Sequence, residues 1–248
     1  MINFLNIKSS DQSMNITKDI EILDLALYIK KQKTLIITDT HIGYEEALNK
    51  QGVLVPRFQF KEIMQKLEKI LKKVKPETII INGDIKHEFG RISEQEWKLT
   101  LRLIDFLSRN CTKLILIRGN HDKILGPIAE KRNIEIAENI LLENILITHG
   151  QNIPDISKNK NIDTIIIGHE HPAVGLKEDS RVEKFKCFLK GRYNDKTLIV
   201  QPSLSLVTEG TDVTKERLLS PFLKQKIDNF DCYIVADKVY KPFKLKKI

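Results

Sequence analysis

Two histidines that are one residue apart, His169 and His171, lie in the stretch TIIIGHEHPAV at residues 164–174. In an extended segment, residues two apart project from the same face, so both imidazoles can point at one place, such as a metal ion. An isolated pair of this kind is at least as often two solvated histidines on a loop. Residues elsewhere in the chain must therefore decide between the two interpretations.

Four more apolar runs also end in residues that bind metals. They are followed by Asp39 and His41 after 34–38, Asp84 after 78–82, Asn120, His121 and Asp122 after 114–118, and His149 after 145–148. Five of the six histidines of the chain lie in these segments or in the GHEH stretch. In sheets with helical crossovers, ligands bind beyond the carboxyl ends of the strands, so these residues should meet at one rim. This convergence predicts a metal centre.

The residue types limit the metals that such a centre would bind. Carboxylate, imidazole and amide-oxygen ligands suit Mn²⁺, Fe²⁺, Ni²⁺ or Zn²⁺. The three cysteines, Cys111, Cys187 and Cys232, are widely spaced and form no C-x-x-C pair. This spacing argues against a disulfide framework and against a thiolate zinc site. We therefore expect nitrogen and oxygen ligands.

The number of potential ligands favours two divalent metal ions that share a carboxylate over a single ion. The seven candidates are Asp39, His41, Asp84, Asn120, His149, His169 and His171. Two ions about 3.5–4 Å apart clamp the attacking and leaving oxygens of a phosphoryl displacement, and they generate a bridging hydroxide near neutral pH. The predicted chemistry is therefore chemistry on phosphate.

The five apolar runs are rich in β-branched residues and are typical of strands buried on both faces. Two helices are predicted between the first three strands. The first carries Ile63, Leu67, Ile70, Leu71 and Val74 before Pro76, and the second carries Trp97, Leu101, Ile104 and Leu107 after a capping box of Ser93 and Glu96. Strands that alternate with helices imply parallel pairing.

Beyond residue 170 the pattern changes to short runs without long helices. These runs are 173–177, 184–190, 197–201, 231–236 and 238–245, and they predict a second, largely antiparallel sheet. The fold class is α/β (α+β), with two packed sheets flanked by helices. A chain of 248 residues without repeats or flexible linkers is expected to form a single domain over 1–248.

The composition is that of an ordinary globular protein, with 41% hydrophobic and 30% charged residues. No apolar run approaches the roughly 20 residues that a membrane helix needs, and the N-terminus does not resemble a secretory signal. We expect a cytoplasmic protein with no membrane partner. The net charge of +8 suits a polyanion such as nucleic acid, although the basic residues are scattered. Genome composition or adaptation to heat would also explain the abundant lysine.

The order of the motifs resembles that of the calcineurin-like metallophosphoesterase superfamily. The series D-x-H, G-D, G-N-H-D, H and G-H-x-H appears here as DTH, GD, GNHD, THG and GHEH over residues 39–171. Residues 26–56 and the stretch INGDIKHEFG at 81–90 are similar to a narrower branch of archaeal proteins and bacterial DNA-ligase-associated phosphoesterases. The resemblance implies a four-layer αββα sandwich with two mixed sheets flanked by helices.

The resemblance also implies a role for each site residue. Asp39, His41, Asp84 and His171 would hold one ion, whereas Asp84, Asn120, His149 and His169 would hold the other. His121 would meet a phosphate oxygen or the leaving group as an acid or charge stabiliser, with Asp122 orienting its ring. For Asp122, a role as a helix or turn cap is an equal alternative.

Three basic residues near the rim are candidates for binding substrate. Many relatives carry a carboxylate a few residues after G-D, whereas this chain has Lys86 and His87, a pair that could bind a phosphate. His87 could instead cap a helix or pair with Glu88. Arg118 could contact phosphate, or it could pair with a surface carboxylate.

The expected function is a dinuclear metal-dependent phosphoesterase that hydrolyses phosphodiester bonds through a metal-bridging hydroxide. The expected substrates are nucleic acid, either DNA or RNA, and nucleotide derivatives, and Mn²⁺ is the ion expected first. Two alternatives stay open at this point. One is a small-molecule phosphodiesterase or phosphatase, and the other is a catalytically silent scaffold that binds nucleic acid or protein.

Overall fold

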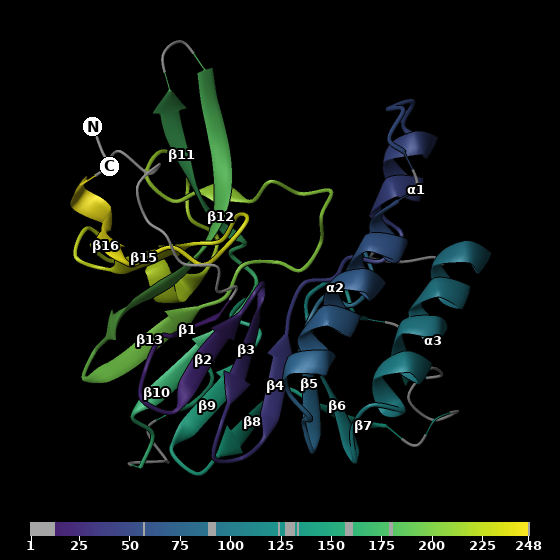
Figure 1. The fold of residues 1–248 in the computed structure, drawn as a ribbon, viewed down its shortest axis with the longest axis horizontal. Helices are drawn as coiled ribbons and strands as arrows, with labels where there is room; N and C mark the ends of the chain where they lie inside the picture. Colours follow the sequence, from purple (N-terminus) through teal and green to yellow (C-terminus); the bar gives the residue numbers. More distant parts are fainter. Residues whose placement is uncertain are drawn as a thin grey trace.

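The fold described here is that of a computed structural model. It describes residues 13–56, 58–88, 93–123, 125–126, 132, 134–156, 161–178 and 181–247. Within these residues the chain forms two mixed β-sheets and three α-helices (Figure 1).

The first sheet has seven strands that are ordered as they occur in the sequence. They are β1 (Ser13–Asn15), β2 (Ile20–Leu23), β3 (Ala26–Ile29), β4 (Thr34–Ile37), β5 (Thr78–Asn82), β6 (Lys113–Ile117) and β7 (Glu135–Ala137). Strands β1 to β4 pair antiparallel, and β4 to β7 pair parallel. The three predicted parallel strands at 34–38, 78–82 and 114–118 are confirmed as the neighbours β4, β5 and β6.

Three α-helices accompany this sheet: α1 (Tyr44–Lys50), α2 (Gln59–Lys73) and α3 (Glu94–Ser108). Helices α2 and α3 are the two predicted crossovers, and Figure 1 shows them beside β5 and β6. Their apolar stripes, which include Ile63 and Leu67 of α2 and Ile104 and Leu107 of α3, are buried against the sheet. Burial of these stripes places the crossovers on one face of the sheet.

The second sheet has nine strands. They are β8 (Asn139–Leu142), β9 (Ile145–Thr148), β10 (Thr164–Ile167), β11 (Pro172–Glu178), β12 (Arg181–Tyr193), β13 (Lys196–Val200), β14 (Thr211–Asp212), β15 (Asp231–Ile234) and β16 (Phe243–Lys244). The order is β14-β11-β12-β13-β10-β9-β8, with β15 paired to β12 and β16 to β15. The antiparallel pairs expected beyond residue 170 are present, and the parallel strands β9 and β10 join them. The strand predicted over 238–245 is limited to Phe243–Lys244.

The two sheets share one hydrophobic core. Ile166 of β10 belongs to the same buried cluster as Ile36 of β4 and Ile80 of β5. Its neighbours Ile165 and Ile167 point the other way, into a second cluster on the outer face of the nine-stranded sheet. This alternation explains why the sequence of β10 is apolar throughout.

The outer cluster is covered by the C-terminal part of the chain. Phe222 and Leu223 of the 3-10 helix η2 (Pro221–Leu223) and Leu245 of η3 (Leu245–Lys247) pack there with Phe230. The prediction of two mixed sheets flanked by helices is therefore confirmed. Among the described residues, the helices on this outer face are short 3-10 turns and not α-helices.

None of the helices in the described part of the chain combines the length and the apolar character needed to cross a membrane.

Candidate metal centre

Every predicted ligand follows a strand of one of the two sheets. Asp39 and His41 follow β4, Asp84 follows β5 and Asn120 follows β6, whereas His149 follows β9 and His169 and His171 follow β10. The carboxyl ends of parallel strands from both sheets thus supply the site.

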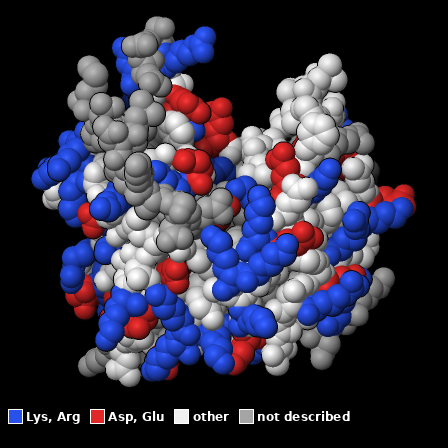
Figure 2. Space-filling model, in the orientation of Figure 1, with Lys and Arg blue, Asp and Glu red and all other residues white. Residues whose placement is uncertain are grey.

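The site lies between the start of α1 and the start of the β11–β12 hairpin. His41 lies shortly before α1, and His171 lies directly before β11, which pairs with β12. Figure 1 shows α1 and the β11–β12 hairpin rising on opposite sides of the molecule, and Figure 2 shows its upper edge hollowed between them. Since the ring nitrogens of His41 and His171 are only 3.2 Å apart, the site lies where the two projections begin.

Asp39, His41 and His171 form the first cluster that could hold a metal ion, with ligand atoms within 4.8 Å of one another. Nε2 of His41 lies 3.2 Å from Nε2 of His171, which lies 3.3 Å from Oδ1 of Asp39. That Oδ1 atom is buried and has no hydrogen-bond partner. A buried carboxylate oxygen without a partner is unusual, and a cation would satisfy it.

Asp84, His149 and His169 form the second cluster. Nδ1 of His149 donates to the carbonyl of Asn82 at 2.9 Å, so Nε2 is the nitrogen left to bind a metal, which would take the place of a proton there; it lies 3.3 Å from Oδ2 of Asp84. A metal-binding histidine is held in this way by a bond from its other nitrogen. Nε2 of His149 and Oδ1 of Asn120 are both buried without a hydrogen-bond partner. The donor set therefore fits a second divalent ion.

Asp84 lies between the two clusters. Its Oδ2 is 3.3 Å from Nε2 of His149 in one cluster and 4.0 Å from Nε2 of His41 in the other. A carboxylate in this position can contact ions on both sides. Among the described residues, the three clusters that could hold a metal consist of histidine and aspartate side chains.

The backbone of the centre is strained at five of these residues. Asp39, His41, Asp84, His169 and His171 have φ values of 51°, 44°, 47°, 64° and 49°. This left-handed region is uncommon for residues with a side chain, and such strain concentrates at functional sites. Main-chain bonds support it, because the amide of Asp39 donates to the carbonyl of Gly83 at 3.1 Å and the amide of His41 donates to the main-chain carbonyl of Asp84 at 3.0 Å.

Two glycines allow the side chains to approach the backbone closely. A Cβ atom on Gly83 would lie 2.1 Å from Nδ1 of His149, and one on Gly119 would lie 2.1 Å from Oδ1 of Asp84. Since no larger residue fits without moving a candidate ligand, these glycines are part of the site.

The carboxylates make the centre attractive to cations. Burial opposes the ionisation of Asp39, but the charges of His171 and His149 hold its pKa well below the usual range. Burial lowers the pKa of His149, but Asp39 and Asp84 outweigh it and raise that pKa to about 9. A site that binds a proton this strongly presents a negative potential, which suits divalent cations.

His121 faces the same centre from the turn after β6. Its amide donates to Oδ1 of Asp84 at 2.8 Å, and its Nε2 lies 3.9 Å from Oδ2 of Asp84. Its Nδ1 contacts the carbonyl of His87, which can only accept a hydrogen bond, so Nδ1 carries the proton. The ring is thereby oriented with Nε2 toward Asp84.

Asp122 and Arg118 make the contacts that the sequence analysis gave as alternatives to an active-site role. Oδ2 of Asp122 accepts from the amide of Gly119 at 3.1 Å, which is a turn cap, while burial and the charge of Asp84 raise the pKa of Asp122 to about 7. Nε of Arg118 donates to Glu138 at 3.0 Å, which is the surface ion pair.

Lys86 and His87, predicted to bind substrate, are placed differently from each other. Lys86 is fully buried, and its Nζ donates to the carbonyl of His121 at 2.6 Å and to that of Glu88, so its ammonium is bound to main-chain carbonyls. The ring of His87 lies in the centre, with its centroid 5.5 Å from that of His41 and 5.4 Å from that of His121. These three histidines form a third group that could hold a metal ion.

Sequence reasoning missed two residues that support the centre. The ring of Tyr44 stacks on that of His87, with 3.9 Å between the ring centroids. Tyr44 lies just after the DTH motif, and this position in the sequence could have identified it as a residue near the centre. Lys186 of β12 is half-buried, and the desolvation of its ammonium lowers its pKa to about 7. Its Nζ donates to the carbonyl of Ser203 at 2.8 Å and to that of Ser205, whose amide donates to the main-chain carbonyl of Asp39 at 3.1 Å.

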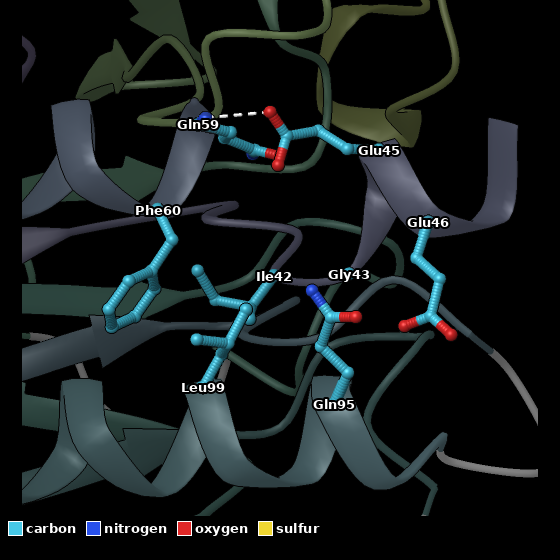
Figure 3. A pocket seen from close by; sticks show the side chains of 8 residues that line it. All are labelled: Ile42, Gly43, Glu45, Glu46, Gln59, Phe60, Gln95 and Leu99. Carbon is cyan, nitrogen blue, oxygen red and sulfur yellow. Dashed lines mark hydrogen bonds between the residues drawn. The ribbon is translucent and has the colours of Figure 1, made fainter. Parts of the chain in front are cut away.

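A small recess lies beside the centre, between α1, α2 and α3 (Figure 3). Its lining includes Glu45, Glu46 and Gln59, and Oε1 of Glu45 accepts from the amide of Gln59 at 2.6 Å. The lining contains two carboxylates and no cationic side chain, so the recess does not favour phosphate.

Two mixed sheets that bring Asp, Asn and His side chains together at their strand ends are characteristic of a metal-binding α/β protein. The family model for calcineurin-like phosphoesterase matches residues 32–157, which is half of the chain, and the protein belongs to this family. Members of the family bind divalent metals and act on phosphoesters.

Comparison with solved structures supports the same fold. The crystal structure of Pseudomonas putida nuclease MPE is similar over 94% of this chain and 99% of that chain, with 20% identity and a TM-score of 0.67. At this identity the likeness shows the fold alone.

Two further solved structures are more distant. The phosphoesterase Yfce from E. coli is 14% identical over 86% of this chain and 98% of that chain, with a TM-score of 0.42. Vps29 from Entamoeba histolytica, complexed with Zn²⁺, has the same identity and coverage and a TM-score of 0.37. Neither score supports a conclusion about this chain. Among curated protein sequences, no match was found.

Proposed function

We propose that the protein is a dinuclear metal-dependent phosphoesterase that hydrolyses phosphodiester bonds. The observation that carries this proposal is the position of Asp84 between two groups of potential ligands, with Nε2 of His149 on one side and Nε2 of His41 on the other. The buried atoms without hydrogen-bond partners, Asp39 Oδ1, Asn120 Oδ1 and His149 Nε2, belong to the same ligand sets.

Each ion has its own set of residues in this proposal. Asp39, His41, Asp84 and His171 hold the first ion, whereas Asp84, Asn120, His149 and His169 hold the second. Mn²⁺ is the ion we propose first, and Fe²⁺, Ni²⁺ and Zn²⁺ suit the same nitrogen and oxygen ligands. Two bound ions would supply the activation of water and the neutralisation of charge on the phosphate.

His121 is the residue that we assign to the leaving group. The carbonyl of His87 accepts from Nδ1 of His121, so the second nitrogen of the ring is directed into the centre. A protonated imidazole held in this way can donate its Nε2 proton to the departing oxygen. The ring of His87 lies next to that of His121, with centroids 5.4 Å apart, and we assign His87 to a phosphate oxygen.

Nucleic acid is the substrate class that we propose. Its support is the net charge of +8, the hollow between α1 and the β11–β12 hairpin, and the shared fold with a nuclease. Figure 2 shows Lys and Arg side chains spread widely over one face, among acidic residues. A scattered basic surface can bind a phosphate backbone without reading its sequence.

The test is hydrolysis by protein that has been stripped of metal and then reloaded. We expect the Mn²⁺-loaded protein to cleave bis-p-nitrophenyl phosphate and single-stranded DNA, and the stripped protein to cleave neither. Protein that holds two ions per chain and still cleaves no aryl diester, aryl monoester or nucleic acid would contradict the proposal. In that case binding of nucleic acid without cleavage would identify a silent scaffold.

A further inference from the structure

The carboxylate of Glu96 accepts hydrogen bonds from a turn outside its own helix, α3, and does not cap that helix. Ser93 and Glu96 form half of the predicted capping box, because Oγ of Ser93 accepts from the amide of Glu96 at 3.0 Å. The other half would require Glu96 to reach back to its own helix start. Instead, Oε1 of Glu96 accepts from the amides of His87 and Glu88, each at 3.0 Å.

The position of Glu96 leaves this side chain little freedom. Only 1% of the residue is exposed, and a Cβ atom on Gly43 would lie 2.8 Å from its Cγ. Glu96 therefore packs against the backbone that follows the DTH motif and bonds to the backbone that follows the GD motif. One side chain of α3 thus touches the segments after both β4 and β5.

The turn at residues 86–88, to which Glu96 is bonded, also contacts His121. The carbonyl of His87 receives Nδ1 of the His121 ring, and Nζ of Lys86 donates to the main-chain carbonyl of His121 at 2.6 Å. Nζ of Lys86 also donates to the carbonyl of Glu88. Residues 86–88 therefore contact His121 at its ring and at its backbone, and Glu96 fixes two amides of the same three residues.

We propose that Glu96 is a positioning residue, which acts on the reaction through the 86–88 turn by fixing the direction and the tautomer of His121. It contacts none of the groups that we assign to the metals. The catalytic part of this inference rests on the proposed function, since it requires His121 to act on the leaving group. The geometric part, which concerns the His121 ring alone, does not.

Three substitutions separate the hydrogen bonds of Glu96 from its charge. Glu96→Gln keeps an oxygen that can accept from both amides but removes the charge. Glu96→Asp keeps the charge, but its carboxylate is one methylene too short, and Glu96→Ala removes both. The matched control is Glu94→Ala, because Glu94 lies in the same helical turn, is exposed and pairs with Lys98.

We expect Glu96→Asp and Glu96→Ala to lower kcat by about 100-fold, since a misplacement of about 1 Å has this effect. KM and the Mn²⁺ content should stay unchanged. Glu96→Gln should lose no more than about threefold, and Glu94→Ala should match the wild type, since neither change removes an acceptor from the turn. A higher kcat for the Asp variant than for the Gln variant would overturn the proposal, and so would wild-type kcat in a folded Ala variant. If the Ala variant does not fold, the order of Gln and Asp still decides.

A second readout does not depend on activity. In protein labelled with ¹⁵N-histidine and loaded with Zn²⁺, NMR at a pH at which the His121 ring is neutral should show its remaining proton fixed on Nδ1 in the wild type and in Glu96→Gln. The Asp variant should show the ring averaging between its two tautomers, and the same spectrum in all variants would overturn the inference. If the wild type cleaves no phosphoester, the proposed function fails, while this measurement still tests the link between Glu96 and His121.

Discussion

Replacing Gly83 by alanine should displace a ligand of the metal centre, because the added methyl group would collide with the ring of His149. Gly83 has a φ of 83°, and a Cβ atom there would lie 2.1 Å from Nδ1 of His149. The left-handed conformation costs an alanine about 1–2 kcal/mol. Because His149 is fully buried, its ring must move and give up the bond to the carbonyl of Asn82. An unmade buried hydrogen bond costs about 1–3 kcal/mol.

The two effects together should lower the free energy of unfolding by about 2–5 kcal/mol. The assay is urea unfolding in the presence of a chelator, which removes any contribution from bound metal. The Mn²⁺ content of the reloaded variant should also fall, from two ions to one, because a displaced His149 no longer faces the second ion.

Gly52→Ala is the matched control for this experiment. Gly52 has a similar φ of 85°, but no atom lies within 4 Å of a Cβ placed on it. Its substitution should cost only the conformational part, about 1–2 kcal/mol, and should leave both ions bound. Equal stability and equal Mn²⁺ content for the two variants would refute the close packing of His149 against the backbone.

Three further predictions concern the proposed roles of residues and substrate. His121→Ala should keep both ions in elemental analysis but lower kcat by about 10²–10⁴-fold, the usual contribution of a general acid. Asp84→Ala should lose both ions. Equal metal loss in the two variants would refute the assignment of these two residues. Chelation should lower the melting temperature, since ions bound to the folded state stabilise it, and an unchanged melting curve would speak against any resident metal. Affinity for DNA should fall steeply as salt rises while turnover of bis-p-nitrophenyl phosphate responds little, and a flat salt response for DNA would favour the small-molecule alternative.

The strands of the centre could be predicted because their signals are local. Runs such as 78–82 and 164–168 are almost wholly apolar, and a candidate metal ligand follows each of them. Their division between two sheets could not be predicted, because a strand buried on both faces has the same pattern in either sheet. In the structure β9 and β10 belong to the second sheet, although their apolar pattern is the same as that of β4 and β5 in the first sheet.

The elements that sequence reasoning missed are short or weakly amphipathic. Helix α1 has seven residues and buries only Ala47, so it carries no apolar stripe. Strands β2 and β3 have four residues each, too few for a pattern to stand out from the chain around them.

Side-chain direction marks the limit of prediction at the site. Lys86 and His87 are neighbours in the sequence, yet the ring of His87 lies among the histidines of the centre while Lys86 is buried under His121. Ser93 and Glu96 have the spacing of a capping box, and tertiary contacts redirect the Glu96 carboxylate to another segment. Such choices depend on which acceptors the fold brings within reach, and the local sequence does not contain that information.

Anomalous diffraction from crystals soaked in Mn²⁺ tests the two-ion centre most directly. The proposed function predicts two peaks about 3.5–4 Å apart, with the carboxylate of Asp84 in contact with both. One peak alone, or no peak beside an ordered Asp84, would contradict it.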